Sequence, residues 1–175
     1  MQYIDFKRIE RVLKLDKTVY KEIRDDKDAL VPALAVLLLS AVIGGLWSIL
    51  ASFGLALVAV VIGTPIGWVI GTGILHIIAK LFGGKSTYTG YLKAMGYAEA
   101  PMALGVIPFV GSFIGGIWSL VCVIYATKEA QEISMGKAIA VVLIPVVLLV
   151  ILALIAGMYF ISMFGGMYPR GYSGY

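Results

Sequence analysis

The chain has 175 residues, of which 61% are hydrophobic and 14% charged, whereas an ordinary soluble domain has about 45–50% and about 25%. The few charges are also unevenly placed, because residues 1–28 hold 8 basic and 7 acidic side chains. This composition excludes a soluble globular protein, and it excludes a disordered chain, which needs low hydrophobicity. It predicts an all-α integral membrane protein with a charged N-terminal head, residues 1–28.

The net charge of +4 is thinly spread, so no basic patch forms that could bind nucleic acid. The single cysteine, Cys122, lies in an apolar run and has no partner for an internal disulfide. The sequence contains no spacing of His and Cys typical of a metal site and no cofactor-binding motif. With one histidine and no nucleophile motif, we expect no metal, no cofactor and no enzyme activity.

Amide side chains are depleted, since asparagine is absent and glutamine occurs only at positions 2 and 131. Depletion of thermolabile residues is typical of thermophile proteins. The sequence therefore predicts a thermophilic prokaryotic source.

Five apolar runs are each close to the length of about 20 residues that a membrane-spanning helix needs. We expect the second to kink at Pro65. The third is interrupted by Lys93, Glu99, Pro101 and Pro108, so it is either a kinked span whose Lys93 snorkels to the interface or a re-entrant element. The kinked span is the preferred interpretation. The predicted spans are 29–53, 55–82, 91–110, 112–127 and 138–164.

The basic residues predict the orientation of these spans. With five crossings, 13 of the 14 Lys and Arg residues lie on the same side as the head, and Arg170 lies alone on the other. Because basic residues concentrate on the cytoplasmic side, we expect a multi-pass protein of the cell membrane with a cytoplasmic N-terminus. The Gly/Tyr-rich tail, 165–175, is then external.

Glycines form a row on the second span, where Gly63, Gly67 and Gly71 recur every four residues. Such glycine-zipper rows let helix backbones approach closely. Gly44 in the first span and Gly115 in the fourth belong to similar rows that could face them. The row predicts helix packing within the chain, and the alternative is a homo-oligomer interface.

A polar stripe runs beside the glycines on the second span. It could line a water-filled path, or the threonine hydroxyls could bond to carbonyls of their own helix while the terminal lysine snorkels. The stripe consists of Thr64, Trp68, Thr72, His76 and Lys80.

His76 and Glu99 are ionisable groups predicted to lie within the membrane, which makes them candidates for a functional site. The loop 83–90 joins their spans, so a helical hairpin would bring them close and allow a pair that offsets part of the desolvation cost. The alternative is that they act as a structural clamp on the third span.

In the head, apolar residues from Ile4 to Leu15 alternate with basic ones. This pattern is typical of an amphipathic helix at the inner membrane surface. We expect the head to bind lipid or a partner there, with a solvated connecting helix as the alternative.

Several short segments occur in a familiar order. Leu81-Phe82-Gly83-Gly84 ends the second span, Gly96-Tyr97-Ala98-Glu99-Ala100-Pro101 lies in the third, and Ile117-Trp118-Ser119-Leu120 lies in the fourth. Tyr97, Pro101 and Trp118 at this separation are the most specific of these features. Over about residues 12–164 the chain resembles the Yip domain, or Ypt/Rab-interacting protein, family in its short prokaryotic form.

The resemblance implies five spans with the N-terminus inside and a role in membrane organisation or trafficking. Eukaryotic members bind prenylated Rab GTPases, but they have a longer N-terminal region and an Asp-Leu-Tyr-Gly-Pro-like motif that this chain lacks. Rab-type GTPase binding is therefore doubtful.

Two functions are consistent with these features. The preferred one is a non-catalytic scaffold or adaptor in the lipid bilayer, which would bind other membrane proteins or a second copy of itself. The alternative is a small transporter or channel that uses the polar stripe and Glu99.

Overall fold

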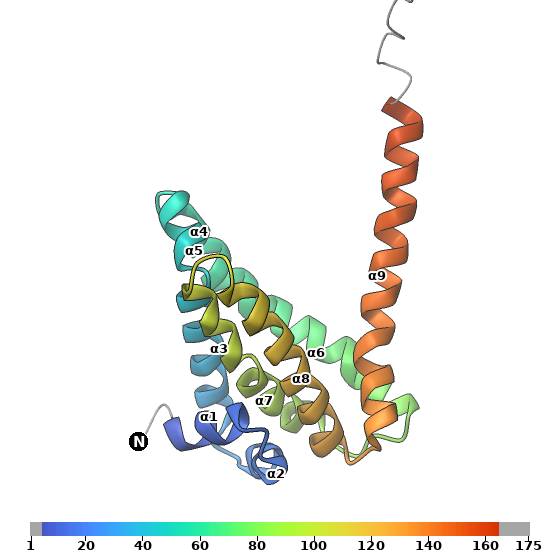
Figure 1. Cartoon of the computed structure of the whole chain (residues 1–175). Helices are drawn as coiled ribbons and strands as arrows, with labels where there is room; N and C mark the ends of the chain where they lie inside the picture. Colours follow the sequence, from blue (N-terminus) through green and yellow to red (C-terminus); the bar gives the residue numbers. More distant parts are fainter. Residues whose placement is uncertain (1–4, 165–175) are drawn as a thin grey trace, which may run out of the picture. The chain divides into compact units, whose positions relative to one another are not determined.

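The computed structural model describes residues 5–164, where all regular secondary structure is helical. The chain divides into two compact units between Val142 and Leu143. The predicted tail, 165–175, lies outside the described residues. Figure 1 shows the order of the helices.

The head folds into two short helices, α1 (Phe6–Leu13) and α2 (Lys17–Asp25). Asp5 and Asp16 are their N-caps, and each carboxylate accepts backbone N–H groups of the first turn. Hydrogen bonds from the Arg11 side chain, and from the hydroxyl and the backbone N–H of Thr18, lower the pKa of the Asp16 carboxyl to about 2.

The first two apolar runs form a helical hairpin whose turn contains Gly54 in the left-handed region, at φ 87°. The second run is interrupted by one π-helical segment directly before Pro65. Because Pro65 has no N–H, the preceding turn cannot keep the α-helical pattern, and π segments are a common way to absorb such a defect. The elements are α3 (Leu30–Gly44), α4 (Leu46–Ala51), α5 (Leu55–Val58), η1 (Ala59–Gly63) and α6 (Thr64–Leu81).

The third apolar run is helical along most of its length, but it is not one continuous α-helix. It begins as α7 (Tyr88–Ala98) and continues after Glu99 as a 3-10 helix, η2 (Ala100–Val106). In Figure 1 the loop after η2 lies at the end of the first unit away from α1 and α2.

The last two helices are longer than the sequence suggested. The helix α8 (Gly111–Gln131) continues four residues past the predicted end, so most of the predicted loop 128–137 is helical. The chain turns at Glu132, whose φ is 55°, and α9 (Met135–Phe164) begins soon after.

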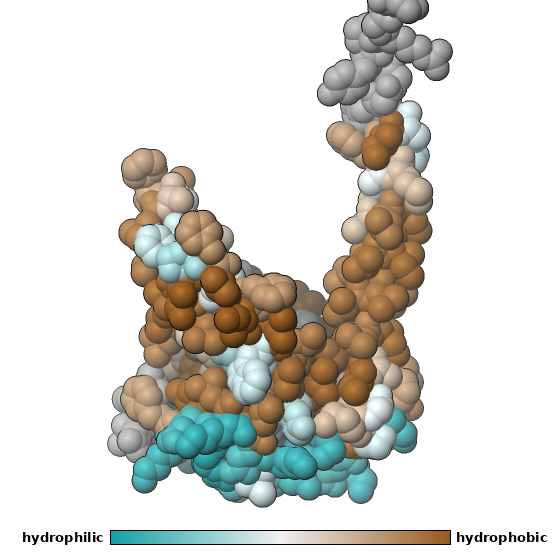
Figure 2. All heavy atoms as spheres, in the orientation of Figure 1, coloured by the Kyte–Doolittle hydropathy of each residue, from teal (hydrophilic) through white to brown (hydrophobic). Residues whose placement is uncertain are grey.

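Within the described part of the chain, three helices are long and apolar enough to cross a membrane: Leu55–Leu81, Gly111–Gln131 and Met135–Met163. Leu30–Gly44 is apolar but shorter. The protein is therefore an all-helical membrane protein, and five crossings stay a prediction. Figure 2 shows hydrophilic side chains gathered at the end of the first unit that carries the head, below a largely apolar surface.

The element η2 lies between α3 and α8, and glycines provide the space for it. A Cβ added to Gly44 would collide with the carbonyl oxygen of Met102, and one added to Gly115 would lie 2.7 Å from the carbonyl oxygen of Pro101. On η2 itself, a Cβ on Gly105 would lie 2.6 Å from the carbonyl oxygen of Gly44. These contacts are backbone against backbone, so no side chain can move aside.

Side chains from both neighbours bond to the backbone where α7 changes into η2. The Ser40 hydroxyl of α3 donates to the carbonyl of Ala100 at 3.4 Å. The Ser119 hydroxyl of α8 lies 3.3 Å from the carbonyl of Ala98 and closer, at 2.8 Å, to Oε2 of Glu99. Trp47 donates its indole N–H to the carbonyl of Val106 at 2.9 Å. Because a broken helix in a membrane must find partners for its free carbonyls, the bonds from Ser40 and Trp47 stabilise the 3-10 segment.

Alanine at Gly115 should test this arrangement. Gly115→Ala forces α8 away from η2 and should lower the free energy of unfolding by roughly 1–3 kcal/mol, the cost of overpacking a filled site. Gly67→Ala on α6 is the matched control, because a Cβ there would meet nothing within 4 Å. Thermal unfolding in the same detergent measures both, and equal midpoints would contradict the packing described for η2.

Candidate functional site

A cavity of about 400 Å³ lies within the first unit, among α3, α6, α7, η2 and α8. This is within the range of about 300–1,000 Å³ typical of small-molecule sites. Most of the wall is apolar. The lining residues are Leu37, Ser40, Ala41, Thr64, Gly67, Trp68, Gly71, Thr72, Leu75, Met95, Glu99, Met102 and Val123.

Three residues of the predicted polar stripe, Thr64, Trp68 and Thr72, line this cavity. The Trp68 indole N–H is already bonded to the carbonyl of Leu92 at 3.1 Å. Neither threonine hydroxyl bonds to its own helix or to any other described residue, although Thr72 is only 2% exposed. The expected self-satisfied threonines are therefore not what the structure shows, and both hydroxyls remain available within the cavity.

Glu99 also lines the cavity, at the junction of α7 and η2. One carboxyl oxygen, Oε2, accepts a hydrogen bond from the Ser119 hydroxyl at 2.8 Å. Glu99 is the one residue of the cavity wall with an ionisable side chain. The wall therefore combines apolar surface with a carboxyl group and unbonded hydroxyls.

His76 does not pair with Glu99, and this differs from the sequence-based expectation. Its Nδ1 lies 2.9 Å from Nε2 of Gln131, a fully buried side chain of α8. The rings of Tyr88 and Tyr91 lie beside it, with centroids 5.8 and 6.0 Å away. His76 thus belongs to a contact that joins α6, α7 and α8, and the cavity does not include it.

The glycine row of α6 has a different neighbour from the one expected. A Cβ added to Gly63, Gly67 or Gly71 would meet nothing within 4 Å. No helix of the described chain packs closely on this face, and Gly67 and Gly71 form part of the cavity wall instead. Lys80, at the end of the stripe, is exposed.

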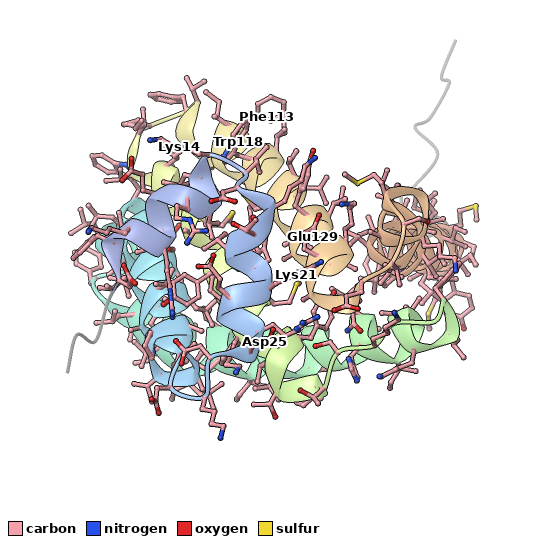
Figure 3. The ribbon with its side chains drawn as sticks, turned by 90° about the horizontal axis from the view of Figure 1, so that it is seen from below. Lys14, Lys21, Asp25, Phe113, Trp118 and Glu129 are labelled. Atoms are coloured by element: carbon pink, nitrogen blue, oxygen red, sulfur yellow. The ribbon has the colours of Figure 1, made fainter. Side chains whose placement is uncertain are left out.

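The head is packed onto the bundle. Figure 3 shows α1 and α2 lying across the end of the helices, with Lys21 directed toward Glu129 of α8, at 3.8 Å. The apolar face predicted to bind a membrane or partner is only partly buried: Val12 is fully buried, whereas Phe6 and Leu13 stay exposed. The other fully buried apolar side chains of the head belong to α2 and are Val19, Tyr20 and Ile23.

Polar bonds from two helices of the bundle, α7 and α8, reinforce this contact. The Trp118 indole N–H donates to the carbonyl of Leu13 at 3.1 Å. The Lys93 ammonium, on a residue only 6% exposed, donates to the carbonyl of Asp26. In return, Arg24 of α2 donates to the carbonyl of Ala130 at 3.0 Å and pairs with Glu132.

The three residues singled out for their family-like spacing all lie at contacts between elements. Tyr97 is fully buried in the core cluster that also contains Val12 of α1. Pro101 is the second residue of η2 and its carbonyl faces Gly115. Trp118 bonds to the head, as described above.

Two contributors were not identified from the sequence, Gln131 and Arg24. The rarity of glutamine was a weak signal for Gln131, whereas nothing in the charged head distinguished Arg24 from its neighbours. In the described residues, no group of His, Cys, Asp or Glu is arranged to hold a metal ion.

The sequence profile of the Yip1 domain matches residues 12–158 of the chain. The chain belongs to the Yip1 domain family. This confirms the resemblance drawn from the sequence. Searches of curated proteins and of solved structures gave no match.

The matched region shows which parts of this Yip1-domain protein form the domain. It begins at Val12 and so includes α2 together with η2 and the cavity. The contact between head and bundle therefore lies within the Yip1 domain and not in an appended segment.

Lys93 offers a test of that contact. Lys93→Met should loosen the head, because the carbonyl of Asp26 loses its donor and two nearby carboxylates lose a cation. A buried group left without its partner costs about 1–3 kcal/mol. We expect faster proteolytic cleavage between residues 14 and 28, measured by limited proteolysis of the purified protein.

Lys27→Met is the matched control, since Lys27 is exposed and makes no bond or ion pair in the described chain. Equal cleavage rates in the two variants would contradict the anchoring role of Lys93.

Proposed function

We propose that this Yip1-domain protein is a non-catalytic multi-pass membrane adaptor that presents its head as a fixed cytoplasmic docking surface. The observation that carries the proposal is the packing of the head onto the bundle. A flexible tether could also recruit a partner, but a head held by buried apolar contacts and by Trp118, Lys93 and Arg24 keeps one orientation relative to the membrane.

The exposed face of the head supports a protein partner more than a lipid surface. Ion pairs within the head neutralise much of its charge. Arg11 pairs with both Asp16 and Glu22, and Arg8 pairs with Asp26. The face therefore carries mixed charges instead of the excess of basic residues that anionic lipids attract. The side chains of Lys7, Lys17 and Lys27 are exposed and make no hydrogen bond or ion pair in the described chain.

We further propose five crossings with the N-terminus in the cytoplasm. The third crossing is supported by length, because the 11 residues of α7 and the 7 of η2 reach roughly 30 Å at about 1.5 and 2.0 Å per residue. This equals the thickness of the hydrocarbon core, about 30 Å. Since a 3-10 helix rises more steeply than an α-helix, η2 lengthens a segment that would otherwise be short.

A small transporter or channel is the second candidate. The observation in its favour is that Thr64, Thr72 and Glu99 line one cavity. The cavity would have to open to water for this function, whereas the adaptor function makes no use of it.

Cysteine labelling tests the orientation and separates the two functions. In a Cys122→Ala background, Lys17→Cys and Lys137→Cys should react with a membrane-impermeant reagent only in inverted vesicles, and Tyr175→Cys only in intact cells. Any other pattern contradicts five crossings. For an adaptor, Thr72→Cys should stay unlabelled from both sides, and labelling from both sides would favour the transporter.

Photo-crosslinking tests the adaptor. A photoreactive residue at Lys17 should form a discrete protein adduct in cells, because this position faces the proposed partner. The same residue at Leu152, an exposed apolar position of α9, is the control and should react with lipid or with other membrane helices. The Lys7→Glu/Lys17→Glu variant, which breaks no ion pair of the head, should lose the partner in a pull-down by at least about tenfold, or roughly 1.4 kcal/mol.

Failure of the Lys17 adduct, or an identical adduct pattern at Lys17 and Leu152, would contradict the adaptor function. Loss of binding in Lys93→Met, with the exposed charges intact, would show that the partner requires the head in its docked orientation.

A further inference from the structure

We infer that the cavity between α3, α6 and η2 is a binding site for a long-chain amphiphile whose small head group donates hydrogen bonds and carries no negative charge. An amine or an alcohol fits this description. The site is separate from the proposed docking surface on the head, so neither proposal depends on the other.

The shape of the site argues for a chain and not for a packed helix. A glycine row normally lets two helices touch, but at Gly67 and Gly71 a Cβ would meet nothing within 4 Å. The wall around them is apolar, with Leu37, Leu75 and Met102 among its members. An elongated apolar group covers such a surface without the bulk of a second helix.

The polar groups of the cavity wall indicate which head group the ligand carries. The Thr72 hydroxyl has no hydrogen-bond partner in the described chain, although the residue as a whole is only 2% exposed. Among the described residues, the fully buried side-chain atoms without a partner are the hydroxyls of Tyr20 and Tyr97, so the Thr72 hydroxyl is accessible from the cavity. An unbonded hydroxyl in a largely apolar wall is unfavourable. A ligand with a hydroxyl or ammonium group would provide the missing partner.

Glu99 selects against an anion. One of its oxygens accepts from Ser119, and no bond to the other oxygen, Oε1, is made by a described residue. No lysine, arginine or histidine lies in the wall. A carboxylate or phosphate head group would therefore be buried beside the carboxyl of Glu99 with no cation to compensate its charge, and burying an unpaired charge is costly.

Trp68 supplies the signal for a direct test, because its ring forms part of the wall. Brominated chains quench tryptophan fluorescence on contact. The full-length protein in nanodiscs of unbrominated phospholipid is titrated with dibromostearylamine, with dibromostearyl alcohol and with dibromostearic acid. A Trp68→Phe variant gives the signal of the two other tryptophans, which is subtracted.

We expect saturable quenching by the amine and the alcohol, reversed by the unbrominated compounds, and binding of the acid weaker by about tenfold or more. Gly67→Leu should abolish the saturable component by filling the cavity. Gly63→Leu is the matched control on the same helix, because its position is equally open but outside the cavity wall, and it should bind as the unmodified protein does.

Two further variants separate the polar contributions without filling the site. Glu99→Gln should weaken binding of the amine by about tenfold and leave binding of the alcohol unchanged. Thr72→Val should weaken both. If Gly67→Leu fails to fold, these two variants carry the test.

Three results would overturn the inference: no saturable quenching by the amine or the alcohol, equal binding of the acid, or unchanged binding in both Glu99→Gln and Thr72→Val. The first would leave a cavity filled by water or by bulk lipid. None of these results bears on the partner adduct at Lys17, so the two proposals fail separately.

Discussion

The structure depends on burying a stretch of broken helix inside an apolar bundle. From Glu99 to Val106 the chain cannot keep α-helical bonding, because Pro101 lacks an N–H. In a membrane each freed carbonyl must find a partner within the protein. Ser40 and Trp47 supply donors, and glycines on α3 and α8 let those helices come close to η2.

This constraint places the other features of the first unit. With α3 and α8 drawn onto η2, the glycine face of α6 is left without a helix against it, and the cavity forms between them. Glu99 lies at the junction, where its carboxyl group is held by Ser119. The neighbouring residue on α8, Trp118, bonds to the head. The cavity and the docking surface are therefore supported by adjacent residues of one helix.

Two expectations from the sequence were wrong for related reasons. The periodicity of Gly63, Gly67 and Gly71 indicates that a helix could approach, but it does not say whether one does, and here Gly44 and Gly115 make the close contacts. The loop joining α6 and α7 indicates that His76 and Glu99 lie on neighbouring helices. It does not fix the depths of the two side chains in the bundle. In the structure His76 contacts Gln131 and Glu99 accepts from Ser119, and both partners lie on α8.

The sequence by itself determined the class of protein, the apolar runs, the unusual third run and the family, because hydrophobicity, proline and local spacing act over short stretches of chain. It also indicated that residues 1–28 are charged and amphipathic. Only the tertiary structure decided that the apolar side of α2 packs on α7 and α8, and that Lys93 bonds to the head. It also decided that Thr72 and Glu99 share a cavity. These outcomes depend on which helices meet and at what depth, and that is set by the packing of distant segments.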